Sequence, residues 1–106
     1  MKASANAAAM PPFHLAFPAT SLAKAREFYG GLLGCPEGRS SEEWVDFNFH
    51  GHQIVAHLSP QASHRDTNIV DGDNVPVRHF GLVLPMPEWQ KLADKLKAAG
   101  TQFIIE

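Results

Sequence analysis

Histidine is the residue type with the clearest capacity for chemistry in this chain. Six histidines stand among 106 residues that include only one cysteine and one tyrosine. The neutral imidazole ring binds divalent metals at neutral pH. His14 and His79 lie 65 residues apart, and each precedes a small residue, Ala16 or Gly81, by two positions. Small neighbours leave room for an ion and its ligand, so the pattern indicates a metal site.

The segments that carry these two histidines have the same organisation. Apolar residues alternate over residues 13–18 and again over residues 79–84, which predicts a strand in each case. A helix with an apolar stripe is expected after each strand. Each helix ends at a glycine, Gly34 or Gly100, which lies 20 or 21 residues after the histidine. The sequence therefore predicts two copies of one strand–helix unit.

The first copy continues into a hairpin. Residues 44–50 and 52–58 both alternate, and Gly51 between them supplies the turn. Asn48 falls on the polar face of the first of these strands, and His57 falls on one face of the second. The complete unit is thus a strand, a helix and a hairpin.

The second copy is shorter than the first. Only six residues follow Gly100, which begin a strand over residues 101–105, whereas the first copy has 25 residues over 35–59. About 19 residues are absent if the copies were once equal. We expect an α+β fold in which paired strand–helix–hairpin units form a half-barrel, with the second unit lacking its last strands.

One domain of this length is expected. Its predicted parts are a flexible leader over residues 1–10 and a single domain over residues 11–106, with a first unit at 13–58, an irregular connection at 59–78 and a second unit at 79–106.

Composition excludes several classes of function. Nine basic against eleven acidic residues give a net charge of -2, which disfavours nucleic acid as a partner. No run of 18 apolar residues is present, so no membrane span is expected. The single cysteine, Cys35, excludes a disulfide framework, favours a cytoplasmic location and is interpreted as a buried, inert thiol.

Three segments of the chain resemble a known superfamily. They are FHLAFPATSLAKAREFYGGLLGC, EGRSSEEWVDFNFHGHQIVAHL and RHFGLVLPMPEWQKLADKLKAAG. The resemblance is to the vicinal oxygen chelate superfamily, which includes glyoxalase I, extradiol dioxygenases and bleomycin resistance proteins. The middle segment is most similar to the branch described as predicted extradiol-type dioxygenases.

The resemblance implies a set of metal ligands. Ligands of this superfamily come from the first and last strands of each unit, which correspond here to His14, His79 and His57. The fourth ligand, usually a Glu in the final strand, would fall beyond Glu106. Three imidazoles suit Fe(II), Zn, Ni or Mn, and Fe(II) is the expected metal.

Two further residues are candidates for substrate binding. Asn48 would line the cavity of the predicted half-barrel, although an exposed strand face would have the same pattern. Arg39, in the EGRSS turn, would neutralise an anionic substrate or serve as a solvated charge.

The predicted function is that of a metal-dependent glyoxalase-like or extradiol-dioxygenase-like protein, a dioxygenase or lyase for a small molecule with vicinal oxygens. The alternative is a metal-free protein of resistance type that sequesters a small ligand on the same fold. A fragment without activity is the third reading. Because superfamily members often dimerise and the sheet edge is unpaired, a homodimer is also expected.

Overall fold

The structure is a computed structural model that describes residues 10–61, 67–76 and 78–103. The chain divides into two compact units, residues 1–62 and residues 63–106. In the part of the chain that is described, no helix is long and apolar enough to cross a membrane.

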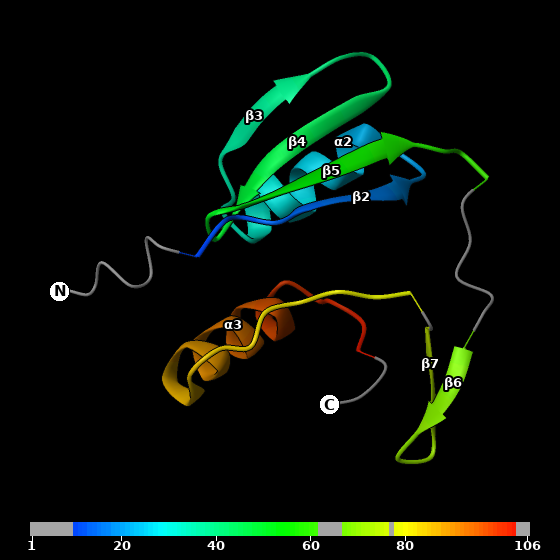
Figure 1. The fold of residues 1–106 in the computed structure, drawn as a ribbon. Coiled ribbons are helices and arrows are strands. Elements are labelled where there is room, and N and C mark those ends of the chain that lie inside the picture. The colour runs from blue at the N-terminus through cyan, green and yellow to red at the C-terminus, as the bar shows by residue number, and fades with distance from the viewer. Residues whose placement is uncertain (1–9, 62–66, 77, 104–106) are drawn as a thin grey trace, which may run out of the picture. The chain divides into compact units, whose positions relative to one another are not determined.

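The first unit contains a four-stranded mixed sheet (Figure 1). In spatial order the strands are β2 (His14–Ala19), β5 (His52–Leu58), β4 (Trp44–Phe49) and β3 (Glu37–Ser40). Strand β2 runs parallel to β5, whereas β4 is antiparallel to both β5 and β3. The predicted α+β class and the hairpin of β4 and β5 are confirmed.

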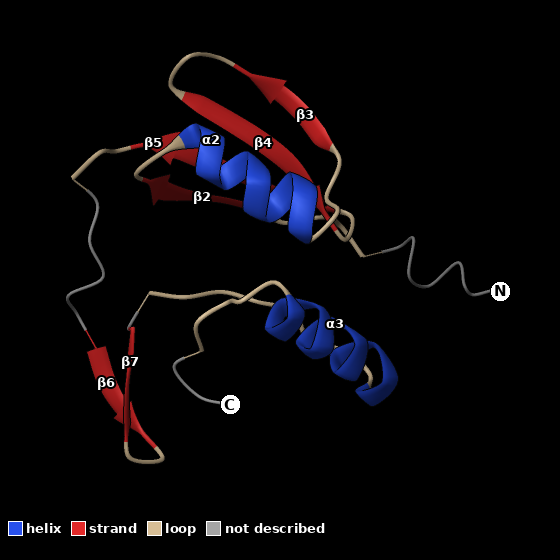
Figure 2. Cartoon of the chain, turned by 180° about the vertical axis from the view of Figure 1, so that it is seen from behind, coloured by secondary structure: helices blue, strands red, loops and turns tan. Residues whose placement is uncertain are grey.

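A helical segment covers one face of this sheet (Figure 2). It comprises α2 (Leu22–Ala25) and the π-helix η1 (Arg26–Leu32). Ser21 caps its start, because the Ser21 hydroxyl oxygen accepts a hydrogen bond from the Lys24 backbone N–H at 3.2 Å. The predicted helix is confirmed, but its second half has wider turns than an α-helix, with the Leu33 N–H donating to the Phe28 carbonyl at 2.8 Å.

The core lies between this helical segment and the sheet. Val45, Phe47 and Ile54 are fully buried. The Tyr29 ring packs against Phe17 and Phe47, with ring centroids 5.3 and 5.6 Å away. Since strand side chains alternate between faces, the apolar set faces the helix and the polar set of the same strands faces away.

Strand β3 is an element that the sequence pattern did not predict. Residues 37–40 have no apolar alternation, so the sequence predicts a turn there. In the structure all four residues are exposed. Their pairing with β4 is irregular, since Glu37 pairs with Phe47 and Ser40 with Val45, which leaves two residues of β3 opposite Asp46. This arrangement is a β-bulge in an edge strand.

The second unit departs from the predicted pattern in the part of the chain before residue 85. The predicted connection at 59–78 contains a hairpin of β6 (Thr67–Val70) and β7 (Asp73–Pro76), which the sequence pattern did not predict. Residues 79–84 form no strand, although they alternate between half-buried and exposed positions. A strand exists only when a neighbour pairs with its backbone, and none does so within the described residues.

The remaining expectations for the second unit concern its end. Helix α3 (Met86–Ala98) is confirmed, and Gly100 follows it in the left-handed region at φ +80°. A strand was expected to begin at residue 101, but residues 101–103 are not in a strand. Residues 104 and 105, like the leader at residues 1–9, lie outside the described residues.

The turn between β4 and β5 yields a stability prediction. His50 and Gly51 both have positive φ, 52° and 92°, and such a turn favours asparagine or glycine at its first position. Because the left-handed region costs most residues about 1–2 kcal/mol, we expect His50→Asn to raise the free energy of unfolding by roughly 0.5–1 kcal/mol. Urea denaturation measures this change. Gly51→Ala should have the opposite effect, and a destabilised His50→Asn protein would contradict the assignment.

Candidate functional site

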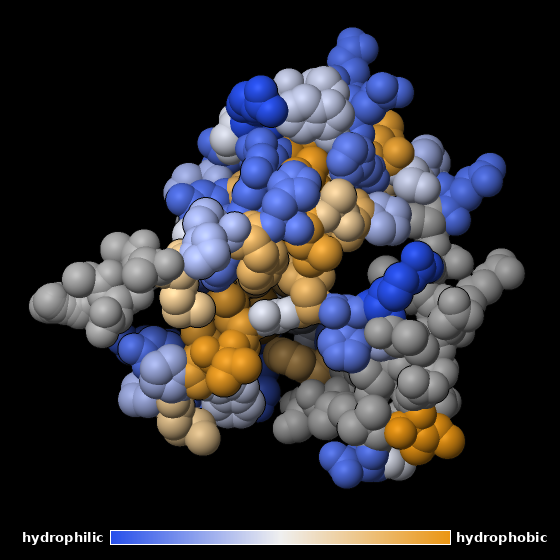
Figure 3. Space-filling model, in the orientation of Figure 1, coloured by the Kyte–Doolittle hydropathy of each residue, from blue (hydrophilic) through white to orange (hydrophobic). Residues whose placement is uncertain are grey.

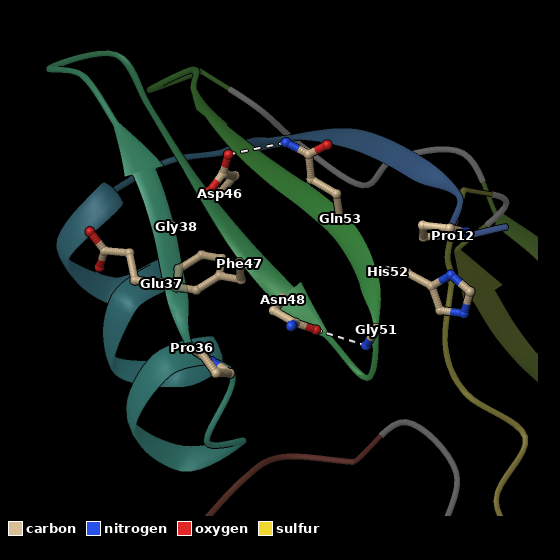
Figure 4. Close-up of a pocket in the computed structure, with 10 residues that line it drawn as sticks. All are labelled: Pro12, Pro36, Glu37, Gly38, Asp46, Phe47, Asn48, Gly51, His52 and Gln53. Carbon is tan, nitrogen blue, oxygen red and sulfur yellow. Dashed lines mark hydrogen bonds between the residues drawn. The ribbon is translucent and has the colours of Figure 1, made fainter. Parts of the chain in front are cut away.

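The buried carboxylate of Asp46 lies on the sheet face that is turned away from the helix. Asp46 is 6% exposed, and within the described part of the chain it is the one charged residue that is buried. Its Oδ1 accepts a hydrogen bond from the Arg39 backbone N–H at 2.6 Å. Its Oδ2 accepts one from Gln53 Nε2 at 3.1 Å (Figure 4). Each carboxylate oxygen therefore has a donor, as burial requires.

The β-bulge explains how a backbone N–H reaches this carboxylate. With two residues of β3 opposite Asp46, the Arg39 N–H points to the side chain. Gly38, the other bulge residue, lies so close that a Cβ at this position would collide with Asp46 Oδ1 and lie 3.2 Å from its Cγ. Only glycine leaves the carboxylate its place.

Gln53 links Asp46 to the first predicted metal ligand. His14 on β2 pairs with Gln53 on β5, and the His14 Nδ1 lies 3.1 Å from the Gln53 Oε1. The His14 side chain is exposed. One row of hydrogen bonds thus runs across all four strands of the sheet, from the Arg39 backbone through Asp46 and Gln53 to the imidazole of His14.

His57 lies on the same sheet face as His14, farther along the strands. It is exposed and pairs with Pro18, four positions beyond the pair of His14 and Gln53. Four residues of strand span about 13 Å. The strand register therefore does not bring His57 next to His14.

His79 belongs to the second unit. Its side chain is exposed, and its Nδ1 lies 2.7 Å from the carbonyl oxygen of Pro76. Across the described ranges, no three His, Cys, Asp or Glu side chains form a group that would hold a metal ion.

Asn48 lines an open cavity of about 410 Å³ in the first unit (Figure 4). The cavity is lined by Pro12, Pro36, Glu37, Gly38, Asp46, Phe47, Asn48, Gly51, His52 and Gln53. Asn48 Oδ1 accepts a hydrogen bond from the Gly51 N–H at 2.7 Å, which stabilises the hairpin turn. Its amide NH₂ is a hydrogen-bond donor on the cavity side of this strand.

Arg39 is exposed and is not one of the cavity-lining residues. Its guanidinium carbon lies 5.8 Å from the centroid of the Trp44 ring, within the range of a cation–π contact. The same residue thus has two separate roles in the structure, since its backbone N–H binds Asp46 while its side chain stacks on Trp44.

Two other groups of chemical interest are held in structural contacts. His52 stacks on Phe13, with ring centroids 4.2 Å apart, and its Nδ1 accepts a hydrogen bond from the Phe13 N–H at 3.0 Å. Cys35 is buried, and this burial raises the pKa of its thiol. A protonated, buried thiol is a poor nucleophile, which agrees with the expectation of an inert cysteine.

Gln53 was missed as a site residue by the sequence reasoning. The alternation of 52–58 places it on the polar face, but only the parallel pairing of β2 with β5 puts it beside His14. No local pattern encodes which residue of one strand lies opposite a residue 39 positions away.

Comparisons with known proteins agree on one family. Residues 12–106 match the family model of the Glyoxalase/Bleomycin resistance protein/Dioxygenase superfamily. A crystal structure of a glyoxalase/bleomycin resistance protein/dioxygenase from Alicyclobacillus acidocaldarius is similar at a TM-score of 0.67 and 32% identity, covering 84% of this chain and 63% of that chain. The chain thus spans less than two thirds of that relative's length. No curated protein matches the chain.

A second solved structure has a similar fold. It is a glyoxalase/dioxygenase from Nostoc punctiforme, with a TM-score of 0.61, 15% identity, and coverage of 88% of this chain and 72% of that chain. At this identity the likeness concerns the fold alone.

The close approach of Gly38 to Asp46 yields a prediction. We expect Gly38→Ala to displace the carboxylate and to lower the free energy of unfolding by about 2 kcal/mol, through overpacking and the loss of hydrogen bonds to a buried charge. Gly81→Ala is the matched control, since a Cβ there meets no atom of the described structure within 4 Å. Equal stability of the two variants in urea denaturation would contradict the packing described for Asp46.

Proposed function

Since the chain belongs to the Glyoxalase/Bleomycin resistance protein/Dioxygenase superfamily, we propose that it is a metal-dependent protein of glyoxalase or extradiol-dioxygenase type. Its substrate is a small molecule with two adjacent oxygens. The similarity of the middle segment to extradiol-type dioxygenases supports an oxygenase over a lyase.

The observation that carries this proposal is that His14 and His79 make the same kind of contact through Nδ1. The two residues are equivalent in the repeat that the sequence predicts, and in each the Nδ1 atom contacts a protein oxygen, from the Gln53 amide or the Pro76 carbonyl. Histidine ligands of metals are commonly held in this way, with one ring nitrogen bonded to an oxygen and the other left for the ion. The donor chemistry of these side chains therefore fits a divalent metal.

We propose His14, His79 and His57 as the metal ligands. Fe(II) is the first candidate, followed by Zn, Ni and Mn, because imidazole ligands suit all four. A bound ion of this kind supplies a Lewis acid that polarises and orients the two oxygens of the substrate. His57 lies about four strand residues from His14, so we assign it the weakest contribution of the three.

Other residues of the chain would orient the substrate. The Asn48 amide NH₂ is a hydrogen-bond donor on the cavity side of β4, suited to a substrate oxygen. The exposed Arg39 guanidinium supplies positive charge for an anionic substrate. The prolines Pro12 and Pro36 give the cavity its apolar part.

A metal-free ligand-binding protein is the second candidate. The cavity of about 410 Å³ favours it, because its volume is within the range of small-molecule sites and its lining combines apolar rings with the amides of Asn48 and Gln53. In this reading the protein sequesters its ligand without changing it.

Metal binding separates the two candidates. We expect purified, untagged protein reconstituted with Fe(II) to hold close to one metal ion per chain, and His14→Ala or His79→Ala to weaken metal affinity about 10-fold or more. His57→Ala should have a smaller effect. His52→Ala is the control and should leave affinity unchanged, because its Nδ1 is bonded to the backbone N–H of Phe13. Less than about 0.1 metal ion per chain in elemental analysis would favour the metal-free candidate.

We further propose that the protein is a cytoplasmic homodimer. Large apolar side chains of the second unit are exposed, among them Ile69, Val83 and Met86, and apolar surface (orange) is visible in Figure 3. Exposed apolar surface of this kind commonly marks an interface. A single cysteine suits the reducing cytoplasm.

Light scattering tests the dimer. We expect a mass of twice the chain's 11.6 kDa, and we expect Val83→Asp to shift the population toward monomer, because a charge buried at an apolar contact is costly. A monomeric mass for the unaltered protein down to micromolar concentration would contradict the proposal.

A further inference from the structure

The two ring nitrogens of His14 are chemically distinct, and the surrounding side chains determine which one carries the proton. We propose that Asp46 and Gln53 are positioning residues that hold His14 in its Nδ1–H form and leave the Nε2 lone pair for a metal ion. The assignment of the proton rests on the hydrogen-bond geometry, and its use for metal binding rests on the function proposed above.

The first step concerns the direction of the Gln53 amide. An ionised carboxylate only accepts hydrogen bonds, and Asp46 Oδ2 lies 3.1 Å from the nitrogen of the amide. The NH₂ group must therefore face Asp46. Its other end, the carbonyl oxygen Oε1, is then directed to His14.

The second step concerns the imidazole. The Gln53 Oε1 is an acceptor, so the His14 Nδ1 at 3.1 Å must be the donor. A neutral imidazole has one proton, and its Nε2 therefore carries a lone pair. The orientation is set by Asp46, two hydrogen bonds away, whose other oxygen is already occupied by the Arg39 N–H.

His79 is also held in its Nδ1–H form, but by a different partner. Its Nδ1 contacts the carbonyl oxygen of Pro76 at 2.7 Å, and a carbonyl oxygen also only accepts. The two repeat-equivalent histidines thus share the Nδ1–H form, although one uses a side-chain amide and the other a backbone carbonyl.

His52 provides an internal contrast on the neighbouring strand. Its Nδ1 accepts a hydrogen bond from the Phe13 N–H, so its proton must be on Nε2. Imidazoles on two neighbouring strands are therefore held in opposite tautomers. His14 is prepared for metal binding, and His52 is not.

A single substitution inverts this hydrogen-bond row without removing a heavy atom. In Asp46→Asn, the side-chain carbonyl oxygen still accepts from the Arg39 N–H, which leaves the new NH₂ facing Gln53. The Gln53 amide then turns its oxygen to residue 46 and its NH₂ to His14. The His14 Nδ1 becomes an acceptor, and the ring proton moves to Nε2.

The test uses the metal-free full chain labelled with ¹⁵N, in long-range ¹H–¹⁵N spectra at about pH 8, where an ordinary imidazole is neutral. We expect Nδ1–H for His14 and His79 and Nε2–H for His52 in the unaltered protein. Asp46→Asn should change His14 alone to Nε2–H. Asp94→Asn is the matched control, because Asp94 accepts a hydrogen bond from the Gln90 amide on α3 in the same manner. An Nε2–H signal for His14 in the unaltered protein, or no change in Asp46→Asn, would overturn the assignment.

A Zn(II) titration of the same proteins tests the consequence for binding. Asp46→Asn should weaken the affinity about 10- to 100-fold, whereas Asp94→Asn should leave it unchanged. A switched tautomer with unaltered affinity would overturn the role of Nε2 as the ligand atom. Absence of Zn(II) binding in the unaltered protein would instead overturn the proposed function, and the tautomers read without metal would still decide the hydrogen-bond assignment.

Discussion

The polar face of the first unit depends on the burial of one charge. A carboxylate that is only 6% exposed must have hydrogen bonds in place of the water it has lost, and Asp46 obtains one from the backbone of β3 and one from Gln53. The first requires a bulge with glycine at position 38, and the second fixes the direction of an amide. Gln53 is also the partner of His14. The hydrogen bonds that the buried Asp46 carboxylate needs therefore determine which ring nitrogen of the exposed His14 carries the proton.

The two faces of the sheet in the first unit have different roles. The apolar face packs against the helical segment around Tyr29 and Phe47 and stabilises the fold. The opposite face carries the amides, the carboxylate and the imidazoles, and includes the lining of an open cavity. A rigid core beneath polar side chains is the arrangement that holds a site in a defined geometry. Superfamily membership gives this face its functional interpretation.

Local signals predicted much of the first unit, whereas pairing between distant segments was not predictable. Alternation located the β4–β5 hairpin, and an apolar stripe located the helical segment that follows β2. Strand β3 was missed because its residues have no apolar face, and Gln53 because parallel register depends on the whole sheet. The expected strand at 79–84 shows the reverse case, in which alternation is present but no described segment pairs with the backbone.

A crystal structure of the protein soaked with Zn(II) would show whether His14 binds a metal through Nε2. Anomalous scattering locates the ion without reference to the protein coordinates. We expect an anomalous peak about 2.0–2.1 Å from His14 Nε2, with the Nδ1 contact to Gln53 retained. Zinc bound at Nδ1 of His14, or bound only at other residues, would contradict it.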